Sequence, residues 1–195
     1  MQLASNEREK LQGQLAINWY AAYVKHQHEK KAADLLHRKG VEVFLPQQKV
    51  IHRWKDRNKT LFLPLFPGYL FLHCNLQDKF QILNTPGVFF LVENGGRACP
   101  IPKQEIDSIR RVTESGVEAQ PHPFVSAGDR VRICSGPLSG VVGILTRFKN
   151  QHRVVLTVEL LQKAVSIEVE LANVELTEDC KRNYGSVTAE LRKTA

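Results

Sequence analysis

The alternation of hydrophobic and polar positions predicts a first strand followed by a helix. Residues 17–25 are rich in aromatic residues and apolar on both faces, which is typical of a central strand in a sheet. In residues 27–39, Ala32, Leu35 and Leu36 recur at the i, i+3 and i+4 spacing of one helix face. A buried strand therefore leads into an amphipathic helix.

The same patterns continue to residue 115. Residues 52–59 are a basic hairpin tip after the second strand, and residues 93–96 are a hairpin turn. This order of elements indicates an α+β domain, with helices packed on an antiparallel sheet. The patterns predict further strands over 41–51, 64–72 and 88–92, and helices over 76–83 and 102–115.

The third strand is entered through two prolines and a glycine. Pro64 and Pro67 fix φ and push the preceding residues towards extended geometry, while Gly68 permits a backbone conformation that a β-carbon resists. A turn of this kind projects Phe66 and Tyr69 from a rigid corner. Two interpretations stay open: these rings are ordinary core, or they form an interface.

The second half of the chain contains short strands only. They lie over 130–134, 141–148, 153–160, 164–169 and 174–176, and they are typical of a small SH3-like β-barrel. The segment Leu160-Leu161-Gln162-Lys163 is compatible with a helix, but the alternating strands around it favour the barrel. The predicted organisation is a flexible extension over 1–16, an N-terminal domain over 17–115, a Pro-containing linker over 116–123, a C-terminal domain over 124–179 and a flexible tail over 180–195.

Positive charge is concentrated in one part of the chain, whose formal net charge is +7. Residues 17–59 hold ten Lys or Arg against four Asp or Glu, whereas residues 124–179 hold six against seven. Such a distribution is typical of a surface that meets nucleic-acid phosphates. The hairpin tip either contacts nucleic acid or is a solvated loop with its tryptophan folded back on the sheet; its candidate residues are Arg53, Trp54, Lys55 and Arg57.

Several other classes of protein are disfavoured by the sequence. The four cysteines form no Cys-x-x-Cys pair, so we expect free, mostly buried thiols, no metal site and no cofactor. No phosphate-binding loop, nucleophile elbow or His-Glu-x-x-His motif is present, and we expect a binding protein rather than an enzyme. No apolar run approaches the ~20 residues of a membrane helix, and the charged N-terminus lacks a signal peptide. We expect a cytoplasmic monomer.

Three motifs in order resemble the NusG family of transcription elongation factors. They are Trp19-Tyr20 in the first strand, Phe66-Pro67-Gly68-Tyr69 in the third, and residues 128–133 (GDRVRI) followed by Gly136-Pro137 and Gly140. The resemblance covers about residues 17–177, and it implies an N-terminal NGN domain and a C-terminal KOW domain. The segment WYAAYVKHQHEKKA and the basic hairpin look more like a specialised RfaH/UpxY-like member than like housekeeping NusG.

The resemblance also implies partners. The NGN domain would bind the β′ clamp helices of bacterial RNA polymerase, with the β gate loop as a second contact, through Trp19, Tyr20, Phe66, Pro67 and Tyr69. We expect Trp19 to be more structural than Phe66 and Tyr69. RfaH-like members read exposed non-template DNA with the first helix, where the matching positions here are Lys25, His26, His28, Lys30, Lys31 and Arg38.

The implied function is transcription elongation and antitermination, serving specific operons. The KOW domain would recruit a further partner, a ribosomal protein or another factor. Leu160-Leu161-Gln162-Lys163 stands where NusG carries a Phe-Gly-Arg turn, which puts contacts with Rho and ribosomal protein in doubt. The alternative function is a ribosome-associated or RNA-binding KOW protein acting in translation, although ribosomal KOW proteins lack an NGN domain.

Overall fold

The computed structural model divides into two compact units, Met1–Ile106 and Asp107–Ala195. The expected α+β architecture is confirmed: antiparallel sheets with a few helices, and a C-terminal unit dominated by strands. The structure describes residues 16–53, 58–122, 124, 128–148 and 151–177. The predicted N-terminal extension, apart from Ala16, and the predicted tail lie outside these residues.

The first unit is built on a four-stranded antiparallel sheet in the order β2-β5-β1-β6. The central strand β1 spans Asn18–Val24, as its two-sided apolar sequence predicts. Its neighbour β5 spans Tyr69–Cys74, and the edge strands are β2 at Glu42–Phe44 and β6 at Val88–Leu91.

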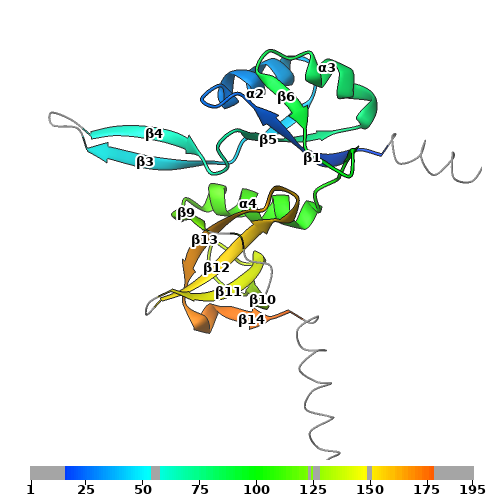
Figure 1. Cartoon of the computed structure of the whole chain (residues 1–195). Coiled ribbons are helices and arrows are strands. Elements are labelled where there is room, and N and C mark those ends of the chain that lie inside the picture. Colours follow the sequence, from blue (N-terminus) through cyan, green and yellow to red (C-terminus); the bar gives the residue numbers. More distant parts are fainter. Residues whose placement is uncertain (1–15, 54–57, 123, 125–127, 149–150, 178–195) are drawn as a thin grey trace, which may run out of the picture. The chain divides into compact units, whose positions relative to one another are not determined.

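Helices cover one face of this sheet (Figure 1). Helix α2 spans Glu29–Arg38, and helix α3 spans Lys79–Leu83 after a 3-10 turn η1 at Leu76–Asp78. Ala32 and Leu36 of α2 and Ile82 of α3 are fully buried among the strand residues. Helix α2 begins two residues later than the pattern predicts, because Gln27 has a left-handed φ of 63° that interrupts the helix there.

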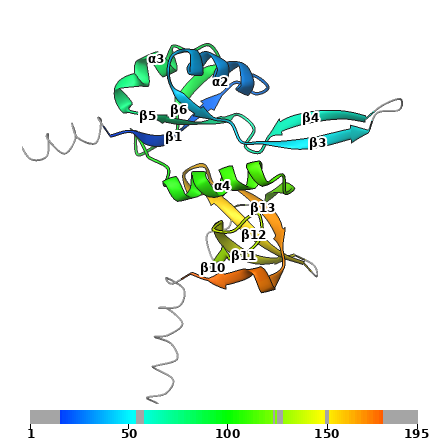
Figure 2. The same cartoon turned by 180° about the vertical axis from the view of Figure 1, so that it is seen from behind.

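A separate two-stranded hairpin, β3 (Gln47–Arg53) with β4 (Asn58–Pro64), extends from the sheet as a ribbon (Figures 1 and 2). The predicted single strand over 41–51 is wrong, because it is divided into β2 and β3 around Pro46. The predicted strand over 64–72 is also wrong: it combines the end of β4, a turn and the start of β5. Gly68, with φ +82°, allows that reversal.

The expected turn over 93–96 lies in a short hairpin between β7 (Glu93–Asn94) and β8 (Arg97–Ala98). Helix α4 follows at Lys103–Ser115, and its predicted inward residues Ile106, Ile109 and Val112 are buried.

The division between the two units falls within α4. In the second unit, Val142 N donates to Ser108 Oγ at 3.4 Å, and Arg111 Nη1 donates to Ser139 O. Strand β9 at Ala119–His122, inside the predicted linker, pairs with β13. The second unit therefore includes most of α4 and this added strand.

The second unit is a six-stranded antiparallel sheet in the order β14-β10-β11-β12-β13-β9. Its core contains Val131, Val154, Leu156, Val165 and Ile167, the inward positions of the alternating pattern. The remaining elements are β10 at Asp129–Ile133, β11 at Val142–Phe148, β12 at Gln151–Val158, β13 at Lys163–Val169, a 3-10 turn η3 at Leu171–Asn173 and β14 at Val174–Leu176.

The Leu160-Leu161-Gln162-Lys163 segment is a tight turn between two long paired strands. A 3-10 turn η2 spans Glu159–Leu161, Gln162 adopts a left-handed φ of 50°, and β13 starts at Lys163. Leu161 is buried and Gln162 is exposed. The structure therefore places a strand-connecting turn where the sequence also permitted a helix.

Candidate functional site

The four-stranded sheet of the first unit has two different faces. Because successive strand residues point to opposite sides, Tyr20 and Val24 of β1 face the helices, and Trp19 and Tyr23 face the other way. The helix side is aliphatic apart from Tyr20 and Cys74. The opposite side is largely aromatic.

We call this opposite side the aromatic face. Trp19 stacks on His73 with ring centroids 4.8 Å apart, and Phe66 meets Phe71 edge-to-face at 5.7 Å. His73 Nδ1 also lies 2.7 Å from Glu42 Oε2. The ring-bearing residues of the face are Trp19, Tyr23, Phe44, Phe66, Tyr69, Phe71, His73 and Phe90.

One end of the aromatic face is exposed. Tyr23 contacts Tyr69 edge-to-face at 5.3 Å and stacks on Phe90 at 5.1 Å. Phe90 is 51% exposed, Tyr23 and Tyr69 are half-buried, and Pro67 beside them is exposed. Burial, and to a smaller extent the Tyr23 phenol, raises the pKa of Tyr69, so this ring is neutral at physiological pH. This end offers aromatic surface to a partner.

The five predicted polymerase-binding residues do not form one surface. Tyr20, which is 2% exposed, belongs to the core under the helices. Trp19 and Phe66 lie on the aromatic face but are 6% and 2% exposed. Only Pro67 and Tyr69 present accessible area, and the structure adds Tyr23 and Phe90, which the sequence analysis missed.

The turn that presents Tyr69 is held by a hydrogen bond to a buried carboxylate. Glu29, in the first turn of α2, is 4% exposed, and its Oε1 accepts a hydrogen bond from Gly68 N at 2.9 Å. A Cβ on Gly68 would lie 3.1 Å from Tyr23 Cε2, so the glycine also lets Tyr23 approach the turn. The basic helix and the aromatic turn are therefore directly connected.

Strand β6 contains a bulge beside this site. Tyr23 pairs with Phe90 and Val24 with Val88, so Phe89 is the extra residue. Val88 and Leu91 both point into the core, while Phe89 is 58% exposed. The only sequence signal for this arrangement is the run Val-Phe-Phe-Leu, which breaks strict alternation.

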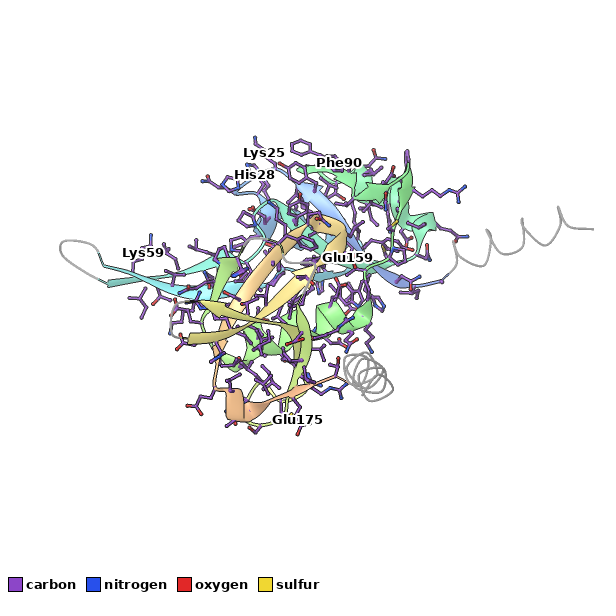
Figure 3. The ribbon with its side chains drawn as sticks, turned by 60° about the horizontal axis from the view of Figure 1, so that its bottom comes forward. Lys25, His28, Lys59, Phe90, Glu159 and Glu175 are labelled. Atoms are coloured by element: carbon purple, nitrogen blue, oxygen red, sulfur yellow. The ribbon has the colours of Figure 1, made fainter. Side chains whose placement is uncertain are left out.

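The predicted DNA-binding residues of the first helix region lie together at the start of α2 and along its outer side. Lys25 and His28 (Figure 3) lie beside Gly87, in the turn before β6, and His28 is half-buried. Lys30 Nζ lies 5.9 Å from the centroid of the Phe62 ring on β4, so the helix also meets the hairpin. Asp34 is an exposed acid on the same side of α2. The exposed members of the predicted set are Lys25, His26, Lys30, Lys31 and Arg38.

The hairpin residues of the predicted nucleic-acid set are mostly not described. Arg53 is the last residue of β3, and Trp54, Lys55 and Arg57 lie outside the described residues. Along the ribbon, Lys49, Ile51 and Phe62 are exposed, and Lys49 pairs with Phe62 across the strands.

The described cysteines differ from the expectation of mostly buried thiols. All three are free, but only Cys74 is buried; Cys99 is intermediate and Cys134 is exposed. Among the described residues, no group of three or more His, Cys, Asp or Glu side chains is placed to hold a metal ion. No helix in the described part of the chain has the length and apolar character to span a membrane.

Comparison with known proteins agrees with this architecture. The family model described as transcription termination factor nusG matches residues 17–110. The transcription termination/antitermination protein NusG of Lactococcus lactis is 31% identical over 178 residues, which cover 84% of this chain and 92% of that protein. The protein of the same name from Thermus thermophilus is 28% identical, covering 82% of this chain and 98% of that one.

The structure is similar to a solved structure of Thermotoga maritima NusG, with a TM-score of 0.53 and 21% identity; the match covers 84% of this chain and 99% of that chain. The fold and the relatives define a two-unit transcription factor of the termination/antitermination class. The chain belongs to the NusG family.

Proposed function

We propose that this protein is a transcription elongation and antitermination factor that binds the β′ clamp helices of bacterial RNA polymerase. The observation that carries the proposal is the exposed end of the aromatic face, formed by Tyr23, Pro67, Tyr69 and Phe90. Aromatic rings supply large apolar area at low conformational cost, which suits the tip of a helical hairpin.

The rigidity of this end also supports a binding role. Tyr69 follows Gly68, whose N–H is held by Glu29, and its ring is packed against Tyr23. A preorganised surface loses little side-chain entropy when a partner docks, so more of the contact energy appears as affinity. Bound there, the protein suppresses pausing and termination by occupancy rather than by catalysis.

The second contact in the proposal is with non-template DNA. Lys25, His26, Lys30, Lys31 and Arg38 are exposed on and beside α2, and their only exposed acidic neighbour on the helix is Asp34. Binding through such groups weakens as salt rises, because phosphate-bound counterions are released. The hairpin, with Lys49 and Lys59 exposed, extends the basic surface away from the sheet.

The third part of the proposal concerns the C-terminal unit. This unit recruits a further protein for the transcripts of specific operons. The contact is made by the turn between β12 and β13, whose sequence differs from the Phe-Gly-Arg turn of NusG. The connection between β12 and β13 exposes Gln162 and Lys163 and buries Leu161, so its contacts are polar. A partner selected by this turn differs from one that requires an exposed aromatic ring.

Gel filtration of the full chain with bacterial RNA polymerase tests the proposal. Wild-type protein is expected to co-elute with polymerase, and Tyr69→Ala and Phe90→Ala are expected to lose co-elution. Phe80→Ala is the control, because Phe80 is a 79% exposed ring on α3 outside the aromatic face. Wild-type protein that binds ribosomal subunits but not polymerase would contradict the proposal and favour the translational alternative.

A further inference from the structure

The bulge in β6 exposes two consecutive phenylalanines where a regular strand would bury one of them. Phe89 and Phe90 are 58% and 51% exposed, while Val88 and Leu91 on either side are core residues. Bulges re-aim side chains and are frequent beside functional sites. Two adjacent exposed rings on an edge strand form an apolar patch, and such patches are typical of interaction surfaces.

The two rings differ in their accessibility to a flat ligand. Phe90 is stacked on Tyr23 with an interplanar angle of 24°, so one of its faces is already covered. Phe89 is tilted by 33° against Tyr23, with its centroid 6.0 Å away. Phe89 therefore has more free ring surface.

The surroundings of the bulge are basic. Lys25 N donates to Gly87 O at 2.8 Å, and a Cβ on Gly87 would lie 3.8 Å from His28 Cβ, so the start of α2 lies directly beside the turn before Phe89. Lys25, His28 and Phe90 are labelled in Figure 3. The carboxylates on these segments have partners: Glu29 Oε1 accepts from Gly68 N and lies 3.7 Å from His26 Nδ1, and Glu93 pairs with Lys79 at 2.7 Å.

We propose that Phe89 is a stacking platform for one base of single-stranded DNA, with Lys25 and His28 contacting the adjoining phosphates. An exposed ring bordered by cationic groups is the combination that single-strand binding proteins use, because every base has a π-face and every nucleotide a phosphate. The inference rests on the proposed function, and it adds to the basic residues an aromatic residue that fixes the position of a base.

The test is titration of the full chain with fluorescein-labelled oligothymidylate at low salt, read by fluorescence anisotropy. Phe89→Leu keeps the apolar character but removes the ring, and it is expected to weaken binding at least about fivefold. Phe89→Tyr is expected to stay within about twofold of wild type, since the ring is retained. Phe80→Leu, which removes an exposed ring on α3, is the matched control and is expected to bind as wild type.

Ultraviolet crosslinking of the same complex, followed by peptide mapping, locates the base. A crosslink on the peptide that contains Phe89 is expected. Melting curves of the variants check that the fold is retained, as the 58% exposure of Phe89 predicts.

Three results would overturn the inference: no binding by wild type, equal weakening by Phe80→Leu, or unchanged affinity of Phe89→Leu. A preference for the oligouridylate of equal length would assign the ring to RNA and also contradict it. Polymerase co-elution that persists in Phe89→Leu while Tyr69→Ala loses it separates this inference from the proposed function. If the wild-type protein does not co-elute with polymerase, the proposed function itself is wrong.

Discussion

The carboxylate of Glu29 accepts a hydrogen bond from the backbone N–H of Gly68 across 39 positions of sequence, at 2.9 Å. Both groups are buried. A buried N–H without an acceptor is costly, and this one lies in the turn between β4 and β5. The pair therefore joins the start of the basic helix α2 to the turn that presents Tyr69, and it connects the two proposed binding surfaces.

Substitution of Glu29 should separate hydrogen bonding from charge. Glu29→Gln keeps a carbonyl acceptor and is expected to cost less stability than Glu29→Ala, which leaves the Gly68 N–H unsatisfied at about 1–3 kcal/mol. Urea unfolding followed by circular dichroism measures both. Equal losses for Gln and Ala would mean that the carboxylate charge, rather than the acceptor, holds the turn.

The conformation of Gly68 can be compared with that of Gly40. Both have φ +82°, but a Cβ on Gly40 would meet nothing within 4 Å, whereas one on Gly68 would press on Tyr23. Gly40→Ala is expected to cost about 1–2 kcal/mol from the left-handed backbone alone. Gly68→Ala should cost more and should also weaken polymerase binding, because Tyr23 must move. If both variants lose the same stability, the contact with Tyr23 is unimportant.

Phe66 and Tyr69 are expected to respond in opposite ways to truncation. Phe66→Ala removes a ring that is 2% exposed and should lower the free energy of unfolding by about 3–5 kcal/mol. Tyr69→Ala removes a half-buried ring and should mainly affect polymerase binding. Melting temperature and co-elution are measured for each. A large stability loss for Tyr69→Ala with binding intact would show that its role is packing.

Much of the first unit can be predicted from sequence periodicity. Where the prediction fails, the failure has a physical cause. The apolar stripe of α2 and the two-sided character of β1 depend on local spacing, and both are present. The family motif predicts that Trp19 and Tyr20 share one surface. Adjacent residues of a strand face opposite sides, so strand geometry alone separates them, as the structure shows.

Other features depend on contacts between distant segments. Glu29 looks like a helix-surface acid in the sequence, and only its partner 39 positions away explains its burial. The Phe89 bulge depends on the register with β1. The prolines of residues 116–123 predict a linker, yet Ala119–His122, which contains Pro121, pairs with β13 as an edge strand, where proline is tolerated.

Alkaline pH should destabilise the first unit through Cys74. Burial, and to a smaller extent the negative charge of Asp78, raises the pKa of the Cys74 thiol from its ordinary 9.0 to about 11. The folded state therefore favours the neutral thiol, and this contribution is complete below pH 9.0 and is lost as pH rises through about 11. The melting temperature, measured by circular dichroism across this range, should fall.

Cys74→Ala is the control for this effect, because Tyr20 and Tyr69, whose pKa values burial also raises, ionise at high pH too. The variant is less stable at all pH values, but its melting temperature should fall less steeply above pH 9.0 than that of wild type. Parallel curves for the two proteins would assign the alkaline destabilisation to the tyrosines.

Gly143 on β11 tests whether the two units unfold separately. A Cβ there would lie 2.6 Å from both Val155 O and Val154 Cγ1, so the neighbouring backbone of β12 must shift. Gly143→Ala is expected to cost stability at or above the upper end of about 1–3 kcal/mol. Amide hydrogen exchange should show lost protection in β10 to β13 and unchanged protection in β1 and β5. Gly136→Ala, whose Cβ would meet nothing within 4 Å but whose φ is +77°, is expected to cost only about 1–2 kcal/mol, from the left-handed backbone, and it should lower protection less. Equal loss in β1 and β5 would mean that the two units unfold together.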